Sequence, residues 1–261
     1  MSESNHLVAI EGGVARVTLN RPAVHNALDD KLIADLRATL EGLAADAAVR
    51  LVMLTGQGAS FCAGGDLAWM RRTADYTFEQ NLADAMMLAR LLHTLNTMPQ
   101  PTVALVNGPA YGGGVGLVAC CDIAVAADTA KFSLSEVRLG LIPATISPYV
   151  VRKIGESSAR RYFLTAEVFE AADAERMGLV HEVVAAAGMD EAAAWFAKRL
   201  REGGPRSQAA AKQLIARVAG APSDEGLMAD TAERIASQRA SAEGKEGTEA
   251  FLAKRPPAWR S

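Results

Sequence analysis

The chain has 261 residues, of which 50% are hydrophobic and 22% charged, enough for a sizeable core beneath a solvated surface. Its formal net charge of −3 gives no overall attraction to nucleic acid or to anionic membranes. The cysteines and histidines show no zinc-ligand spacing, and no uncharged apolar stretch is long enough to span a bilayer. We therefore expect a cytoplasmic protein without a metal, a nucleic-acid partner or a membrane segment.

Strand-like and helical segments alternate through the first half of the chain. Helices are expected to begin at Asp29 or Asp30 and at Asp66, and a longer one covers 77–98, where Pro99 stops it. Between them lie β-rich runs at 14–20, 49–56, 102–107 and 122–128. This alternation predicts an α/β core with mostly parallel strand pairing.

The pattern changes after about residue 155. Helical segments follow one another, with one strand-like patch at 179–184. We therefore divide the chain into an α/β core, residues 1–195, and a helical C-terminal subdomain, residues 196–261.

Two glycine-rich turns follow strands, at 60–67 and at 107–116. Ligands of parallel α/β sheets gather beyond the carboxyl ends of the strands, and glycine lets backbone N–H groups approach them. The two turns could aim two N–H donors at one oxygen, or each could be only a tight strand-to-helix turn. A dinucleotide-binding turn is the weaker alternative, because five residues separate the strand from the glycines of the second segment.

Glu136 is the candidate acid/base. It is a single carboxylate flanked by apolar residues in KFSLSEVRLGLIP. Partial burial would raise its pKa toward that of a useful proton shuttle. A solvated acid at a helix start is the alternative reading of the same residue.

Together these segments resemble the crotonase (enoyl-CoA hydratase/isomerase) superfamily. The resemblance runs from VTLNRPAVHNAL through LVMLTGQGASFCAGGDL and NGPAYGGGVGLVACCDIAVAAD to AERMGLVHEVV and EGTEAFLAKRPPAW. It implies a crotonase-like core of parallel-strand superhelical turns with a helical C-terminal subdomain, assembled as a homotrimer or a dimer of trimers. It also implies an acyl-CoA thioester as substrate, with no cofactor beyond the coenzyme A that the substrate carries.

The resemblance also assigns site residues. The family's oxyanion hole, two backbone N–H groups that hold the thioester oxygen, falls here on Ala63 and Gly113. Losing one such donor typically costs roughly 3–4 kcal/mol. The family's substrate and CoA contacts fall on Val24, His25, Ala63, Gly64, Gly65, Asp66, Gly113, Phe251 and Lys254, the last two often reaching a neighbour's CoA.

One position departs from the family pattern. The hydratases normally use two glutamates, and here one is Glu136 while Gly116 replaces the other. A finer resemblance, to hydratases of branched glutaconyl-CoA esters such as 3-methylglutaconyl-CoA, suggests that Gly116 makes room for a substituent on the β-carbon. The attacking water would then be held by the substrate's own carboxylate or by Tyr111, Ser135 or Ser147.

The expected function is therefore hydration of an enoyl-CoA with Glu136 as acid/base. The alternative is a Δ3,Δ2-enoyl-CoA isomerase in which Glu136 alone carries a proton between carbons. A catalytically weakened scaffold that binds CoA or RNA is the alternative of another class.

Overall fold

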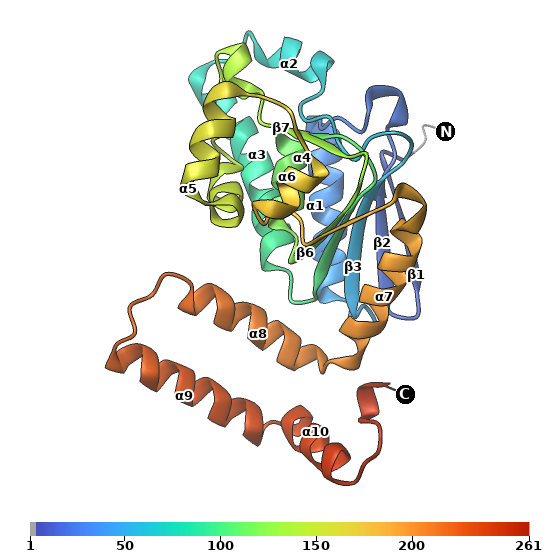
Figure 1. The fold of residues 1–261 in the computed structure, drawn as a ribbon. Helices are drawn as coiled ribbons and strands as arrows, with labels where there is room; N and C mark the ends of the chain where they lie inside the picture. The colour runs from blue at the N-terminus through green and yellow to red at the C-terminus, as the bar shows by residue number, and fades with distance from the viewer. Residues whose placement is uncertain (1–3, 261) are drawn as a thin grey trace.

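A six-stranded sheet forms the centre of the computed structural model, which describes residues 4–260 (Figure 1). Its order is β1-β2-β3-β4-β6-β9; β1 and β2 pair antiparallel, and the other neighbours pair parallel. The expected α/β core with mostly parallel pairing is confirmed. The strands are β1 (His6–Glu11), β2 (Val14–Leu19), β3 (Leu51–Gly56), β4 (Thr102–Val106), β6 (Ile123–Ala127) and β9 (Glu182–Val184).

Helices cover both faces of this sheet. On one face lie α1 (Asp30–Ala45) and α3 (Phe78–Thr97), whose leucines join the main core. The Asp29 carboxylate caps α1 by accepting from the Leu32 N–H, and Thr77 caps α3 with a capping box to Gln80. On the other face α7 (Met189–Glu202) buries Ala193 and Phe196 against side chains of β3 and β4.

A second, three-stranded sheet lies beside the first. It consists of β5 (Ala110–Tyr111), β7 (Lys131–Ser133) and β8 (Phe169–Glu170). Phe132 and Phe169 stack across it at 5.5 Å between ring centroids. The helices that surround it are α4 (Gly113–Cys120), α5 (Ser147–Thr165) and α6 (Ala171–Arg176), and the short 3₁₀ turns of the chain are Pro22–Val24, Glu136–Leu139, Ala186–Gly188 and Ala258–Arg260.

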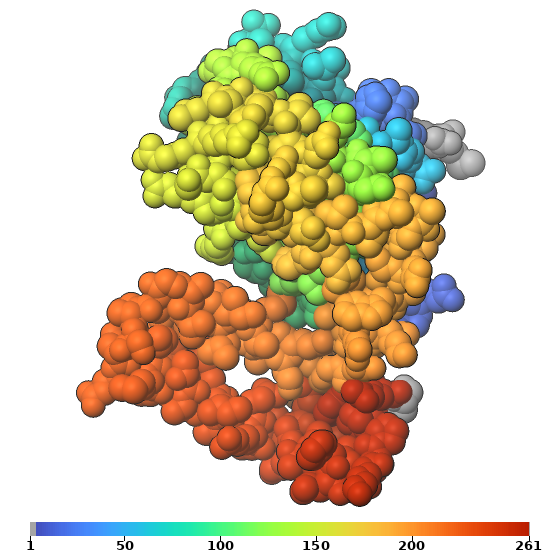
Figure 2. Space-filling model, in the orientation of Figure 1, coloured from blue at the N-terminus to red at the C-terminus, as the bar shows by residue number. Residues whose placement is uncertain are grey.

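The C-terminal helices form an arm that stands off from this body, with open space between parts of the two (Figures 1 and 2). They are α8 (Pro205–Val218), α9 (Glu225–Ala240) and α10 (Ala242–Leu252). The predicted boundary between residues 195 and 196 is wrong, because it falls inside α7, which packs on the sheet. The chain leaves the body after α7, at Gly203 and Gly204.

No helix within residues 4–260 is long and apolar enough to cross a membrane.

Candidate active site

A cavity of 370 Å³ opens where the segments that follow β3 and β4 meet. Its walls come from residues 63–65, from the short helix α2 (Leu67–Thr73), from Gly112 and Gly113, and from the stretch 135–146. Figure 1 places α2 at one end of the molecule and the arm at the other. The cavity therefore lies at the carboxyl-end edge of the sheet, as expected for a ligand site in a parallel α/β fold.

Hydrogen bonds hold the two glycine-rich turns side by side. The Tyr111 N–H donates to the Cys62 carbonyl at 2.9 Å, and Cys62 pairs with Ala110 as an isolated parallel bridge. Gly64 has a φ of +89°, and a β-carbon on it would lie 3.0 Å from the Tyr111 carbonyl oxygen. Glycine is thus needed at position 64 for this close approach.

The backbone hydrogen bonds of the first glycine-rich turn differ from those expected. The Ala63 N–H donates to the His25 carbonyl at 2.9 Å, the Asp66 N–H donates to the Leu28 carbonyl at 2.8 Å, and the Gly64 N–H hydrogen-bonds to the Cys62 thiol. Within the described chain the Gly65 N–H has no acceptor. The assignment of an oxyanion donor to Ala63 is therefore corrected: the free amide of this turn belongs to Gly65.

In the second turn the Gly113 N–H has no hydrogen-bond acceptor within residues 4–260. Helix α4 begins there, and the Gly116 N–H makes the first intrahelical bond, to the Gly112 carbonyl at 3.2 Å. The N–H groups that precede it in a helix have no partner of their own, and they carry the positive end of the helix dipole. Both Gly65 and Gly113 line the cavity.

Glu136 brings a carboxyl group into the same cavity and is the one titratable side chain among the described residues that line it. It begins a 3₁₀ turn whose Gly140 and Leu141 N–H groups return to the Glu136 carbonyl. Its Oε2 is buried and has no hydrogen-bond partner within residues 4–260, and burial raises the pKa of the carboxyl above its ordinary value. A raised pKa suits a group that must both accept and release a proton near neutral pH.

Gly116 does not line the cavity and opens no room in it. A β-carbon on Gly116 would overlap the side chain of Ile146 and lie 3.0 Å from the Ile146 Cβ. Ile146 is 2% exposed and itself lines the cavity. The expectation of free space beside Gly116 is therefore wrong, because Ile146 already fills the volume that a side chain at 116 would need.

Of the three side chains considered for holding water, one reaches the cavity. Ser135 lines it, whereas Tyr111 and Ser147 do not. The Ser147 hydroxyl donates instead to the Ala144 carbonyl at 2.8 Å. Thr145, which the sequence did not single out, lines the cavity with Ser135.

An ion-pair network supports the first turn. The Arg21 guanidinium lies 2.9 Å from the Asp29 carboxylate and 3.0 Å from that of Asp66. Asp66 caps α2 through the N–H groups of Ala68 and Trp69. Burial alone would raise the pKa of Asp66, but these backbone donors and Arg21 together lower it. Asp66 thus fixes the turn and α2, and it is not among the residues that line the cavity.

The remaining expected CoA contacts lie outside this cavity. Val24 is exposed, and the His25 ring pairs with the Ser60 hydroxyl at 3.0 Å. Phe251, 81% exposed, and Lys254 belong to the arm, at the opposite end of the molecule from α2 (Figure 1). They cannot reach the cavity of their own chain.

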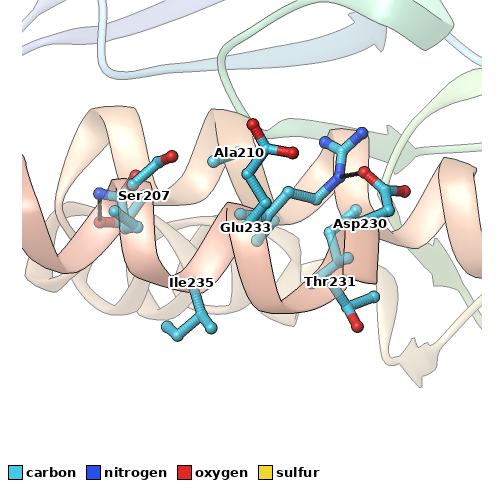
Figure 3. Close-up of a pocket in the computed structure, with 11 residues that line it drawn as sticks. Ser207, Ala210, Asp230, Thr231, Glu233 and Ile235 are labelled. Carbon is cyan, nitrogen blue, oxygen red and sulfur yellow. Dashed lines mark hydrogen bonds and ion pairs between the residues drawn. The ribbon is translucent and has the colours of Figure 1, made fainter. Parts of the chain in front are cut away.

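A second cavity, of 530 Å³, lies between α8 and α9 of the arm (Figure 3). Its Asp230 is neutralised by Arg234 at 2.9 Å and by Arg217 at 2.8 Å, and its Ser207 hydroxyl pairs with Glu243. These groups already have partners, so we place the chemistry at Glu136. Across residues 4–260, no three His, Cys, Asp or Glu side chains gather as metal ligands.

Comparisons with known proteins find similar sequences and structures over nearly the whole chain. The family model described as Enoyl-CoA hydratase/isomerase matches residues 9–261. Among solved structures, an enoyl-CoA hydratase from Shewanella pealeana is 43% identical with a TM-score of 0.96, over 98% of this chain and 96% of its own. Pseudomonas aeruginosa AtuE is 38% identical with a TM-score of 0.94, over 99% and 100%. The 2,3-dehydroadipyl-CoA hydratase of Escherichia coli is 33% identical, over 97% of this chain and 98% of its own.

Proposed function

Because the chain belongs to the enoyl-CoA hydratase/isomerase family, the crotonase superfamily, we propose that it adds water reversibly across the α,β double bond of an enoyl-CoA, with Glu136 as acid/base. One observation carries this proposal. The Glu136 carboxyl, whose Oε2 is buried and has no hydrogen-bond partner in the described chain, shares one cavity with the free amides of Gly65 and Gly113.

The two amides would form the oxyanion hole. A thioester carbonyl conjugates poorly with sulfur, so attack at the β-carbon places negative charge on the thioester oxygen as an enolate. Fixed N–H donors act where this charge develops, and each is typically worth about 3–4 kcal/mol in the transition state. The α4 dipole at Gly113 adds to the same stabilisation.

Glu136 would carry both proton transfers. As a carboxylate it takes a proton from water while the hydroxyl oxygen bonds to the β-carbon, and as the acid it then gives that proton to the α-carbon. Because one carboxyl serves both the α-carbon and the β-carbon, the hydroxyl group and the proton must add to the same face of the double bond. The hydroxyl groups of Ser135 and Thr145 are the other polar side chains in the cavity wall that can hold the water.

Replacing Glu136 by Gln tests this assignment. The variant keeps the size and shape of the side chain and can still form hydrogen bonds, but it cannot accept and release a proton, so kcat should fall by about 10²–10⁴-fold. Loss of the conjugated thioester absorbance reports turnover, and calorimetry with a saturated acyl-CoA should show unchanged binding. Turnover within threefold of the wild type would end the role of Glu136.

Isomerisation is the second candidate, and Ile146 favours it. Gly116 carries no side chain and Ile146 occupies the space beside it, so among residues 4–260 Glu136 brings the one carboxylate to the cavity wall and no second carboxylate there helps to hold water. A single carboxyl suffices to move a proton between two carbons. Mass detection separates the two reactions, because hydration adds one water to the ester and double-bond migration adds nothing.

A non-catalytic scaffold predicts neither reaction. It would bind a CoA ester, or RNA in a salt-sensitive manner, and leave every enoyl-CoA unchanged. The free amides and the buried, partnerless Oε2 of Glu136 favour an enzyme, since a scaffold has no use for either.

The glutaconyl part of the expected substrate has no support in the cavity. A branched glutaconyl ester ends in a carboxylate, and neither Lys, Arg nor His lines the cavity within residues 4–260. We therefore propose that the substrate is an enoyl-CoA whose acyl chain has no terminal carboxylate.

We also propose that the chain assembles as a homotrimer or a dimer of trimers through its arm. Exposed apolar side chains on the arm support this, among them Ile215, Met228 and Phe251. Packing against a neighbour would bury them and could bring Phe251 and Lys254 to that neighbour's bound ester. Light scattering after size-exclusion chromatography measures the mass, and a monomer at micromolar concentration would contradict this assembly.

A further inference from the structure

Most of the side chains that line the cavity are apolar. They include Ile146, which packs against Gly116, and Trp69 and Met70 of α2. The Trp69 indole N–H donates to Asp84 at 3.0 Å, which leaves the ring and not its polar atom to face the cavity. An acyl chain that entered here would meet hydrocarbon.

The rim of the cavity is also apolar, and it is exposed. Leu67 is 74% exposed, Leu141 54% and Ile142 71%, and all three line the cavity. Large aliphatic side chains gathered at a mouth and left in water mark a binding surface. A hydrocarbon chain lying across them would remove that apolar surface from water, which favours binding.

Among residues 4–260, the one charged side chain that lines the cavity is that of Glu136. Asp84 lies behind Trp69 with a pKa that burial raises. The cations on α2 and on the Glu136 turn are Arg71, Arg72 and Arg138; none of them lines the cavity, and Arg72 is paired with Asp30. A carboxylate placed in this cavity would lose its water, gain no cation and lie near an existing carboxyl.

We propose that this cavity selects enoyl-CoA esters whose acyl chain is aliphatic and uncharged, and rejects esters whose chain ends in a carboxylate. The inference rests on the proposed function, because it requires the ester to bind with its thioester at Gly65 and Gly113. It distinguishes this chain from its relative in Escherichia coli, whose name specifies a dicarboxylic ester.

Binding is measured apart from turnover with two saturated esters of equal chain length, hexanoyl-CoA and adipyl-CoA, by calorimetry. Neither can be hydrated, so the comparison reports the cavity alone. We expect hexanoyl-CoA to bind about 10²-fold more tightly. Equal binding, or tighter binding of adipyl-CoA, overturns the inference.

A variant pair locates the selection in the cavity. Ile142→Lys adds a cation at the rim and should reduce the preference for hexanoyl-CoA over adipyl-CoA about tenfold. Leu164→Lys adds the same charge at a side chain that is 72% exposed on α5 and does not line the cavity, so its preference should match the wild type. The inference is also overturned if both variants change the ratio of the two affinities equally, or if neither variant changes it.

Turnover of hex-2-enoyl-CoA and 2,3-dehydroadipyl-CoA tests the proposed function separately. Hydration of the first alone supports both proposals. Hydration of the dicarboxylic ester at an equal or higher kcat/KM overturns the selectivity and leaves the hydratase standing. Binding with the expected preference but no turnover of either ester overturns the hydratase and leaves the selectivity standing.

Discussion

Gly112 lies directly against the Glu136 carboxyl: a β-carbon on Gly112 would be 3.0 Å from Glu136 Oε1. The same glycine has a φ of +46° and is the residue from which α4 begins. One backbone position therefore sets both the location of the acid and the start of the helix whose first amide, that of Gly113, faces the cavity.

Gly112→Ala should displace the Glu136 carboxyl and lower kcat by about 10²-fold, because small misplacements of reacting groups are costly. KM should change little. The control is Gly220→Ala, which has a φ of +74° but nothing within 4 Å of its added β-carbon. It imposes a similar backbone strain far from the cavity, so its kcat should equal that of the wild type. Equal kcat in both variants would show that Gly112 does not place Glu136.

Gly116→Ala should lower the free energy of unfolding by about 1–3 kcal/mol, because the added methyl group overlaps Ile146. Gly42→Ala is the matched control: Gly42 lies inside α1 with nothing within 4 Å, and alanine there should stabilise by about 0.5–1 kcal/mol. Denaturant unfolding measures both. Combining Gly116→Ala with Ile146→Ala should cost less than the two single changes added together, and strict additivity would argue against the overlap.

Glu136→Gln should also change how stability depends on pH. Burial raises the pKa of Glu136 in the folded chain above its unfolded value, so the folded state binds a proton more tightly. The wild type is therefore relatively stabilised at pH below the unfolded pKa, and it loses this stability as pH rises through the folded pKa. The glutamine variant does not titrate. Its melting temperature relative to the wild type should rise as the pH increases above the unfolded pKa of glutamate, about 4.3; a difference that stays constant with pH would contradict the raised pKa.

Asp66→Ala should lower both stability and kcat. It removes the cap of α2 and one partner of Arg21, at a cost of about 0.5–2 kcal/mol, and it loosens the turn that holds the Gly65 amide. Asp224→Ala removes the equivalent cap of α9, where the carboxylate accepts from the Leu227 N–H at 2.8 Å. It should cost similar stability with no change in kcat. If kcat fell equally in both, the effect of Asp66 would be one of stability alone.

The sequence predicted the parts of this structure that depend on local chemistry. The caps at Asp29 and Asp66 and the strands β2, β3, β4 and β6 are close to where they were expected, because capping and apolar periodicity are read from neighbouring residues. Strand β1 was not predicted. The small sheet was missed, since two- and three-residue strands carry no periodicity. The domain boundary was wrong because helical pattern alone does not show that α7 packs on the sheet.

The residues of the site were likewise predicted only in part. Glu136 and Gly113 lie in the cavity as expected, but the motif that contains Ala63 could not show which of its amides is free. That depends on the His25 carbonyl, which the chain brings to Ala63 from another segment. The contact between Gly116 of α4 and Ile146, which directly precedes α5, joins segments far apart in the sequence and left no local signal.

The contact between Gly116 and Ile146 also limits how a second acid could be added to this cavity. A larger side chain at position 116 meets the side chain of Ile146 before it reaches the cavity. Residue 146 must therefore become smaller in the same protein, and that change alone leaves a void in the core. Engineering a two-acid site in this chain thus requires a paired substitution at positions 116 and 146.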